Sequence, residues 1–195
     1  MNEENSMQHV TQAVFAYWFG GLDEAAAETA QPFWFKSTPE IDTEIRARFQ
    51  DFHLRAKQGG FDNDAESADD FLAIIIMLDQ FPRNMYRGTA QAFETDPLAR
   101  QWAARALEKG MDQQQPAPNR RMFFYLPFEH AENMADQNEA VRLFEKMGYD
   151  ELTGYAKAHR DIITTYGRFP HRNAVLGRTS TPDEEVYLSQ PGAGF

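Results

Sequence analysis

The chain of 195 residues contains no cysteine, which excludes disulfide bonds, a thiol nucleophile and a cysteine-ligated metal site. It also lacks a long apolar run, since the longest, from Phe71 to Leu78, is too short to cross a bilayer. The opening stretch MNEENSMQHV has neither the basic residues nor the apolar core of a signal peptide. Together these absences predict a cytoplasmic protein.

Positive charge is scarce, with 19 Lys and Arg against 30 Asp and Glu and a net charge of −11. Nucleic-acid phosphates and anionic membranes both require a broad basic surface, so we expect neither as a partner. The sequence also has no HExxH, GxSxG or GxxxxGK[ST] motif and no calcium-binding loop. We therefore predict no metal and no cofactor, and most familiar enzyme classes are excluded.

Apolar residues recur at helical spacing along nearly the whole chain, often between a capping residue and a glycine. The expected helices cover residues 10–18, 41–56, 68–80, 97–109, 119–134, 137–147, 151–166 and 182–188. Ser67 with Asp70, and separately Asp96 and Asp136, are the expected caps. A buried strand is the alternative for residues 68–80, because Ile74, Ile75 and Ile76 are β-branched, but the cap and the length favour a helix. The pattern predicts an all-α fold of about seven to eight helices in antiparallel pairs, forming a single domain over 1–195.

Aromatic residues gather in the stretches FAYWFGG and QPFWFK, where we expect core packing; a ligand-stacking platform is the alternative. His53, His130 and His159 fall on apolar helix faces. A histidine at such a position is typical of a hydrogen-bonded core residue.

Two stretches resemble each other: DQFPRNMYRGT from Asp79 and GRFPHRNAVLGRT from Gly167. We call them the first and second FP segments; each has a Phe-Pro that is expected to end a helix. They carry five arginines and one carboxylate, and Arg, Asn and His side chains can recognise an anion. The predicted ligand-binding residues are Asp79, Gln80, Arg83, Asn84, Arg87, Arg168, His171, Arg172 and Asn173. Equally, these arginines could cap helices and pair with the chain's own carboxylates.

The stretch LPFEHAENMAD holds further titratable groups. If it is helical past Pro127, then Glu129, Glu132 and Asp136 share one face, and a positive group should lie opposite: an arginine of the FP segments or a metal ion. The competing interpretation places Asp136 at the cap of the next helix. The candidates for acid–base catalysis are His130, His171, Glu129 and Glu132.

With YWFG, Trp34-Phe35, FFYLPFEHAENMADQ and the closing PGAGF, the two FP segments make the chain resemble a bacterial family, domain of unknown function 924. The resemblance runs from about Val14 to Phe195. It implies an all-helical fold similar to tetratricopeptide-repeat superhelices, with a right-handed array, and implies no established reaction. The recurrent motif positions of the family correspond to Asp79, Gln80, Arg83, Asn84, Glu129, His130, Glu132, Asp136, Gln137, His171, Arg172 and Asn173. That they gather in one site is our hypothesis.

Three functions remain open from the sequence. The first is a binding module whose Arg/Asn/His pocket holds an anionic small molecule or a peptide carboxylate. The second is a hydrolase or group-transfer enzyme on an anionic substrate, using His and Glu as acid and base. The third is a scaffold in which the FP segments only support the fold and a surface binds another protein. Neither enzymatic activity nor the oligomeric state follows from the sequence.

Overall fold

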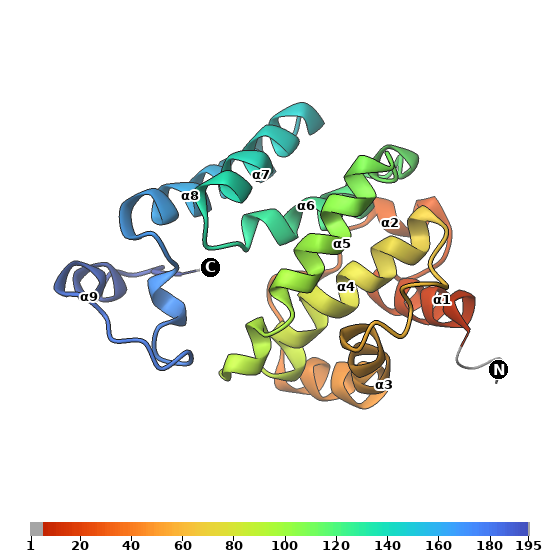
Figure 1. Ribbon diagram of the computed structural model, residues 1–195, viewed down its shortest axis with the longest axis horizontal. Helices are drawn as coiled ribbons and strands as arrows, with labels where there is room; N and C mark the ends of the chain where they lie inside the picture. The colour runs from red at the N-terminus through yellow and green to blue at the C-terminus, as the bar shows by residue number, and fades with distance from the viewer. Residues whose placement is uncertain (1–5, 195) are drawn as a thin grey trace. The chain divides into compact units, whose positions relative to one another are not determined.

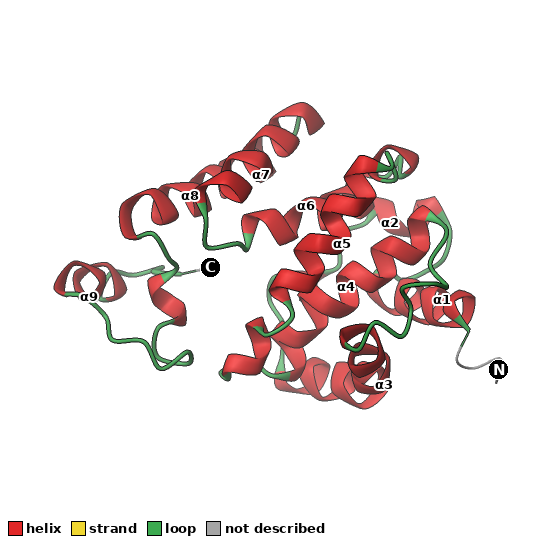
Figure 2. Cartoon of the chain, viewed as in Figure 1, coloured by secondary structure: helices red, strands yellow, loops and turns green. Residues whose placement is uncertain are grey.

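The computed structural model describes residues 6–194, and among them every regular element is helical (Figures 1 and 2). The predicted all-α fold is therefore confirmed. The described α-helices are α1 Met7–Trp18, α2 Glu24–Glu28, α3 Pro39–Lys57, α4 Ala68–Met85, α5 Asp96–Glu108, α6 Pro118–Glu129, α7 Met134–Met147, α8 Asp150–Tyr166 and α9 Pro182–Leu188. Short 3-10 turns lie at Pro32–Trp34, Ala90–Phe93, Asp112–Gln114 and Pro170–Arg172. The closing motif PGAGF reaches Phe195, which lies outside the described residues.

The helices of the described chain exceed the expected number by one, because the short α2 was not anticipated. The strand alternative for residues 68–80 is wrong, since these residues lie inside α4. Sequence neighbours pack as pairs, with α4 against α3 and α5, and α7 against α8. Because Gly148 takes a left-handed conformation at the end of α7, the chain turns directly into α8. The tetratricopeptide-like superhelical array stays a prediction.

The chain divides into two compact units. The first unit contains the residues up to Arg87 together with Gln91–Pro127, and the second contains Gly88–Ala90 and the residues from Phe128 onward. The boundary after Pro127 falls within α6. The single domain over 1–195 stays a prediction.

Helix α4 is the centre of the first unit, and its side chains from Phe71 to Pro82 are all buried. A capping box starts it, with the Ser67 side chain accepting from the Asp70 amide, as predicted. Aromatic rings pack around its far end: Trp18 lies 5.6 Å from both Phe81 and Phe123 between ring centroids. The aromatic groups are thus core, as expected. Phe35 is the exception, with 70% of its surface exposed.

The first FP segment does not end its helix at Pro82, and that expectation is wrong. Helix α4 continues to Met85, so Arg83 and Asn84 remain on the helix. Proline has no amide hydrogen for the carbonyl four residues earlier, which here belongs to Leu78. The hydroxyl of Thr95 donates to that carbonyl instead, at 2.6 Å. A partner distant in sequence therefore lets the helix pass through proline.

Two predicted caps are also wrong by a few residues. Asp96 is the first residue of α5 and not its cap, and Thr95 in the cap position makes no side-chain capping bond, because its hydroxyl serves Leu78. At α7 the cap is Asn133, whose side chain accepts from the amide of Asp136. Asp136 therefore lies in the first turn of the helix, where a carboxylate interacts favourably with the helix dipole.

The second FP segment follows the end of its helix, but Gly167 ends that helix before the chain reaches Phe169-Pro170. Helix α8 ends at Tyr166, Gly167 adopts a left-handed conformation, and Pro170 opens a 3-10 turn. The segment then leads to α9, which begins with a capping box between Thr181 and Glu184. This places His171, Arg172 and Asn173 on a turn between two helices of the second unit.

Candidate functional site

The arginine of the first FP segment that lies on α4 binds carboxylates of the first unit. The two terminal nitrogens of Arg83 donate hydrogen bonds to the two carboxylate oxygens of Asp96, at 2.9 and 3.0 Å. Arg83 Nη1 also lies 3.4 Å from Asp79 Oδ1. The Asp79 carboxylate is fully buried and accepts a hydrogen bond from Gln80. These predicted ligand residues therefore contact each other and Asp96, and one guanidinium is shared by two carboxylates at the end of α4.

The other two predicted residues of this segment share a different carboxylate. Arg87 donates to Asp42 at 2.6 and 3.0 Å, and Asn84 donates to it at 2.8 Å. Burial raises the pKa of Asp42, but the hydrogen bonds from Arg87, Asn84 and Ser37 outweigh it, and the pKa lies below its ordinary value. Asp42 comes from α3, so these contacts join α3 to the end of α4.

In the second unit, Arg168 and Asn173 both bind Glu184 of α9. Arg168 forms two short bonds with the carboxylate, at 2.6 and 2.7 Å, and Asn173 donates to it at 3.2 Å. The Arg168 guanidinium lowers the pKa of Glu184 to about 2, and the Thr181 amide contributes in the same direction. These two residues therefore connect the second FP segment to the start of α9.

Glu132 pairs with Arg178, an arginine of the second FP segment. The guanidinium donates to both carboxylate oxygens, at 2.6 and 3.0 Å, and the Phe169 amide adds a bond of 2.8 Å. Burial raises the pKa of Glu132, yet these hydrogen bonds bring it below its ordinary value. The positive group expected opposite the acidic residues is thus an arginine. No local pattern pairs residues so far apart in sequence.

Glu129, Glu132 and Asp136 do not share a helix face, and that expectation is wrong. Glu129 ends α6, Glu132 lies in the following loop, and Asp136 lies in α7. The chain leaves helical geometry after Glu129, where Gln137 donates to the carbonyls of Glu129 and Ala131 at 2.6 and 2.8 Å. A buried amide side chain therefore satisfies the carbonyls that the helix end exposes.

A connected series of ring contacts lies in the second unit, and we call its members the histidine cluster: His130, His159, Phe169, His171 and Arg172. The His159 ring centroid lies 6.4 Å from that of His130 and 5.7 Å from that of Phe169. Phe169 also lies 5.6 Å from His171, and the Arg172 guanidinium lies 4.5 Å from the Phe169 ring. Three of the predicted residues, His130, His171 and Arg172, thus lie in one cluster.

His159 links this cluster to a carboxylate. Its Nδ1 atom lies 2.9 Å from the Tyr155 carbonyl and 3.2 Å from Glu129 Oε1. Burial lowers the pKa of His159 to about 3, and the positive charges of His130, Arg172 and His171 act in the same direction. The expectation of a hydrogen-bonded core histidine is confirmed, and so is that for His53, which contacts the Met77 carbonyl at 2.9 Å. The sequence did not indicate the contact of His159 with Glu129, because 30 residues separate them.

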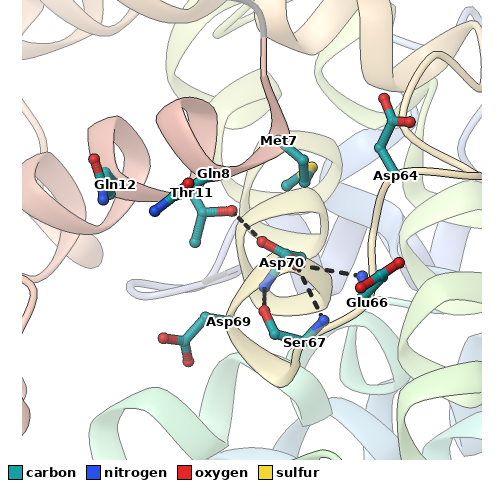
Figure 3. Close-up of a pocket in the computed structure, with 9 residues that line it drawn as sticks. All are labelled: Met7, Gln8, Thr11, Gln12, Asp64, Glu66, Ser67, Asp69 and Asp70. Atoms are coloured by element: carbon teal, nitrogen blue, oxygen red, sulfur yellow. Dashed lines mark hydrogen bonds between the residues drawn. The ribbon is translucent and has the colours of Figure 1, made fainter. Parts of the chain in front are cut away.

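A cavity of about 360 Å³ lies elsewhere, in the first unit, between the starts of α1 and α4 (Figure 3). Its lining is Met7, Gln8, Thr11, Gln12, Asp64, Glu66, Ser67, Asp69 and Asp70, with none of the predicted site residues. Asp70 is held by the Thr11 hydroxyl at 2.7 Å and by the capping box, as the dashed lines show. No residue of either FP segment therefore lines this cavity.

Neither a metal site nor a membrane-spanning helix is found among residues 6–194. No group of three or more His, Asp and Glu side chains there could hold a metal ion. None of the described helices combines the length and apolar composition needed to span a membrane.

Comparison with known proteins identifies the family. The model of a family described as bacterial protein of unknown function (DUF924) matches residues 14–192. The chain belongs to this family. It is also similar to a solved protein of unknown function from Agrobacterium tumefaciens, with 44% identity, a TM-score of 0.77, and coverage of 81% of this chain and 89% of that one. The comparison with curated proteins finds no match. Both FP segments and the histidine cluster lie inside the DUF924 match.

Proposed function

We propose that this DUF924 protein binds an anionic small molecule or the carboxylate end of a peptide, and that the histidine cluster is the binding site. The observation that carries the proposal is the chain of ring contacts in the second unit: His171 and Arg172 lie against Phe169, and His159 joins this ring to His130. Imidazolium and guanidinium groups both donate hydrogen bonds to carboxylates and phosphates. The two imidazoles are half-buried, so they combine some access with partial desolvation.

The remaining arginines are weaker candidates because each holds a carboxylate of the chain. Arg83, Arg87, Arg168 and Arg178 pair with Asp96, Asp42, Glu184 and Glu132, respectively. A ligand at these positions would have to displace a short, charge-assisted contact. These pairs support the interpretation that much of both FP segments maintains the fold.

Binding is tested by following the histidine ring signals by NMR during titration with inorganic phosphate and with succinate at about pH 6, where an ordinary imidazole is largely protonated. The wild-type protein should show saturable shifts of His130 and His171. His130→Gln and His171→Gln should each weaken binding at least about tenfold, as loss of a charged hydrogen bond predicts. His9→Gln, at an exposed histidine outside the cluster, is the matched control and should bind normally.

Two outcomes would overturn this proposal. One is the absence of saturable shifts with either anion. The other is equal affinity for the wild type and both cluster variants, which would place any anion elsewhere.

The second candidate is acid–base catalysis by the same cluster, favoured by the contact of Glu129 with His159 at 3.2 Å. Because the pKa of His159 is lowered to about 3, His159 would act as the group that links Glu129 to His130, and His130 would be the acid or base. Aryl phosphate and aryl ester hydrolysis can be measured for the wild type, Glu129→Gln and His130→Gln. An enzyme should lose turnover in both variants at neutral pH, whereas equal background rates in all three would exclude catalysis of these reactions.

A further inference from the structure

The carboxyl-terminal segment Pro191–Gly194 returns from α9 to the histidine cluster, and we call it the terminal cover. Gly194 has φ +92°, in the region that favours glycine. A Cβ atom added to Gly194 would lie 3.1 Å from Cβ and 3.2 Å from Cγ of His171. Such contacts are tighter than nine in ten real Cβ contacts, so a side chain at Gly194 would require the His171 side chain to shift.

Tyr187 holds the terminal cover in place. Its hydroxyl oxygen accepts a hydrogen bond of 3.0 Å from the Gly194 amide. The tyrosine ring lies 5.3 Å from that of Tyr166, so it is positioned by both α9 and α8. The contact thus connects the last described residue to the helix that precedes the second FP segment.

The four residues of the terminal cover are exposed or only half-buried, so little apolar contact holds the segment in place. Pro191 and Gly192 are exposed, and Ala193 and Gly194 are only half-buried. None of the four has a long apolar side chain that could anchor the segment in a core. Segments with few buried apolar contacts open at low free energy, below that of global unfolding.

From these contacts we propose that the terminal cover restricts access to His171 and moves aside when a molecule approaches the imidazole. The role of the movement in anion binding rests on the proposed function, but the shielding of His171 does not. Tyr187 and Gly194 are then positioning residues for the closed state. Replacement of either should shift the chain toward the open state.

The shielding is tested in the full-length protein with diethyl pyrocarbonate, which acylates accessible imidazole nitrogens, and with mass spectrometry to obtain a rate for each histidine. Tyr187→Phe removes the acceptor of the Gly194 amide and keeps the ring. Gly194→Val places a branched side chain against His171. Both variants should raise the His171 rate several-fold, while exposed His9 reacts at an unchanged rate and serves as the internal reference.

Gly177→Ala is the matched control. Gly177 lies outside the terminal cover and also has a positive φ, of 64°. A Cβ atom added there would meet nothing within 4 Å. It should leave the His171 rate near the wild-type value. If Gly194→Val proves unstable in thermal unfolding, the conservative Tyr187→Phe variant decides the question.

Repeating the reaction with inorganic phosphate separates the two proposals. An unchanged His171 rate in Tyr187→Phe overturns the terminal cover, whether or not phosphate protects the histidine. Raised rates without protection by phosphate or succinate in any form uphold the cover and count against the proposed function. Raised His171 acylation rates in the variants, together with stronger protection by phosphate or succinate than in the wild type, support both the terminal cover and the proposed function.

Discussion

Thr95 donates a hydrogen bond to the carbonyl oxygen of Leu78 at 2.6 Å, where Pro82 has removed the helical donor. Thr95 is 1% exposed, so water has no access to replace the bond. A buried carbonyl without a partner is costly, which explains why a proline can lie inside the most buried helix of the first unit.

Thr95→Val should therefore destabilise the protein by about 1–3 kcal/mol, since the shape is kept and the buried carbonyl loses its donor. Urea unfolding measures the free energy. Thr43→Val is the control, because the Thr43 hydroxyl also donates to a carbonyl but is exposed, and its loss should cost less than about 0.5 kcal/mol.

A double-mutant cycle with Pro82→Ala checks the cause. Alanine restores an amide hydrogen for the Leu78 carbonyl, so Thr95→Val should cost clearly less in that background. Equal costs in both backgrounds would mean that the hydroxyl does not compensate for proline.

Arg83→Ala should cost about 3–5 kcal/mol, because it leaves the buried Asp79 with less compensating charge. The stability of Arg83→Lys should lie between those of the wild type and Arg83→Ala, since an ammonium group cannot donate to Asp96 from two nitrogens. Arg142→Ala removes a surface pair with Glu139 and should cost less than about 1 kcal/mol. Similar losses at positions 83 and 142 would contradict the assignment of Arg83 to the fold.

Glu184→Gln should destabilise the protein at neutral pH by an amount that depends on pH. The folded pKa of about 2 lies below the ordinary value of 4.5, so between these values the unfolded chain binds more protons. The contribution of the ionised Glu184 carboxylate to the free energy of unfolding is therefore complete above about pH 5, and it is lost as the pH falls toward 2. Unfolding free energies of wild type and variant should converge over that range.

The neighbouring Glu185→Gln is the control for that series, because Glu185 is exposed on the same helix. Its effect should be small at every pH. A difference between wild type and Glu184→Gln that stays constant from pH 7 to 2.5 would refute the role of the Glu184 charge.

His159 should remain uncharged in the folded protein between pH 5 and 8, because burial lowers its pKa to about 3 from 6.5. In this range the unfolded chain binds the additional proton, so His159 makes the protein less stable as the pH falls below about 6.5. NMR titration of the ring carbons measures this directly. In urea the same residue should titrate near about 6.5, and a folded midpoint above 6 would contradict its burial as a neutral ring.

Local signals in the sequence located most of the helices, although the caps at Asp96 and Asp136 and the helix end at Pro82 were wrong. The capping pair Ser67–Asp70 was predicted correctly at the start of α4 because it acts within one helical turn. The candidate site was less predictable: His130, His171 and Arg172 were found as candidates, but the part played by His159 was not. Its contact with Glu129 joins α8 to the end of α6, and no short-range pattern encodes it.

The sequence by itself determined the all-helical class, most helix positions, the aromatic core and the family. These follow from periodicity, caps and long motifs, which operate over neighbouring residues. Only the tertiary structure decided that Pro82 lies within a helix and which carboxylate each arginine holds. The reason is physical: Thr95 and Leu78, or Arg178 and Glu132, meet only after helices pack, and burial then makes an unpaired carbonyl or charge too costly to leave.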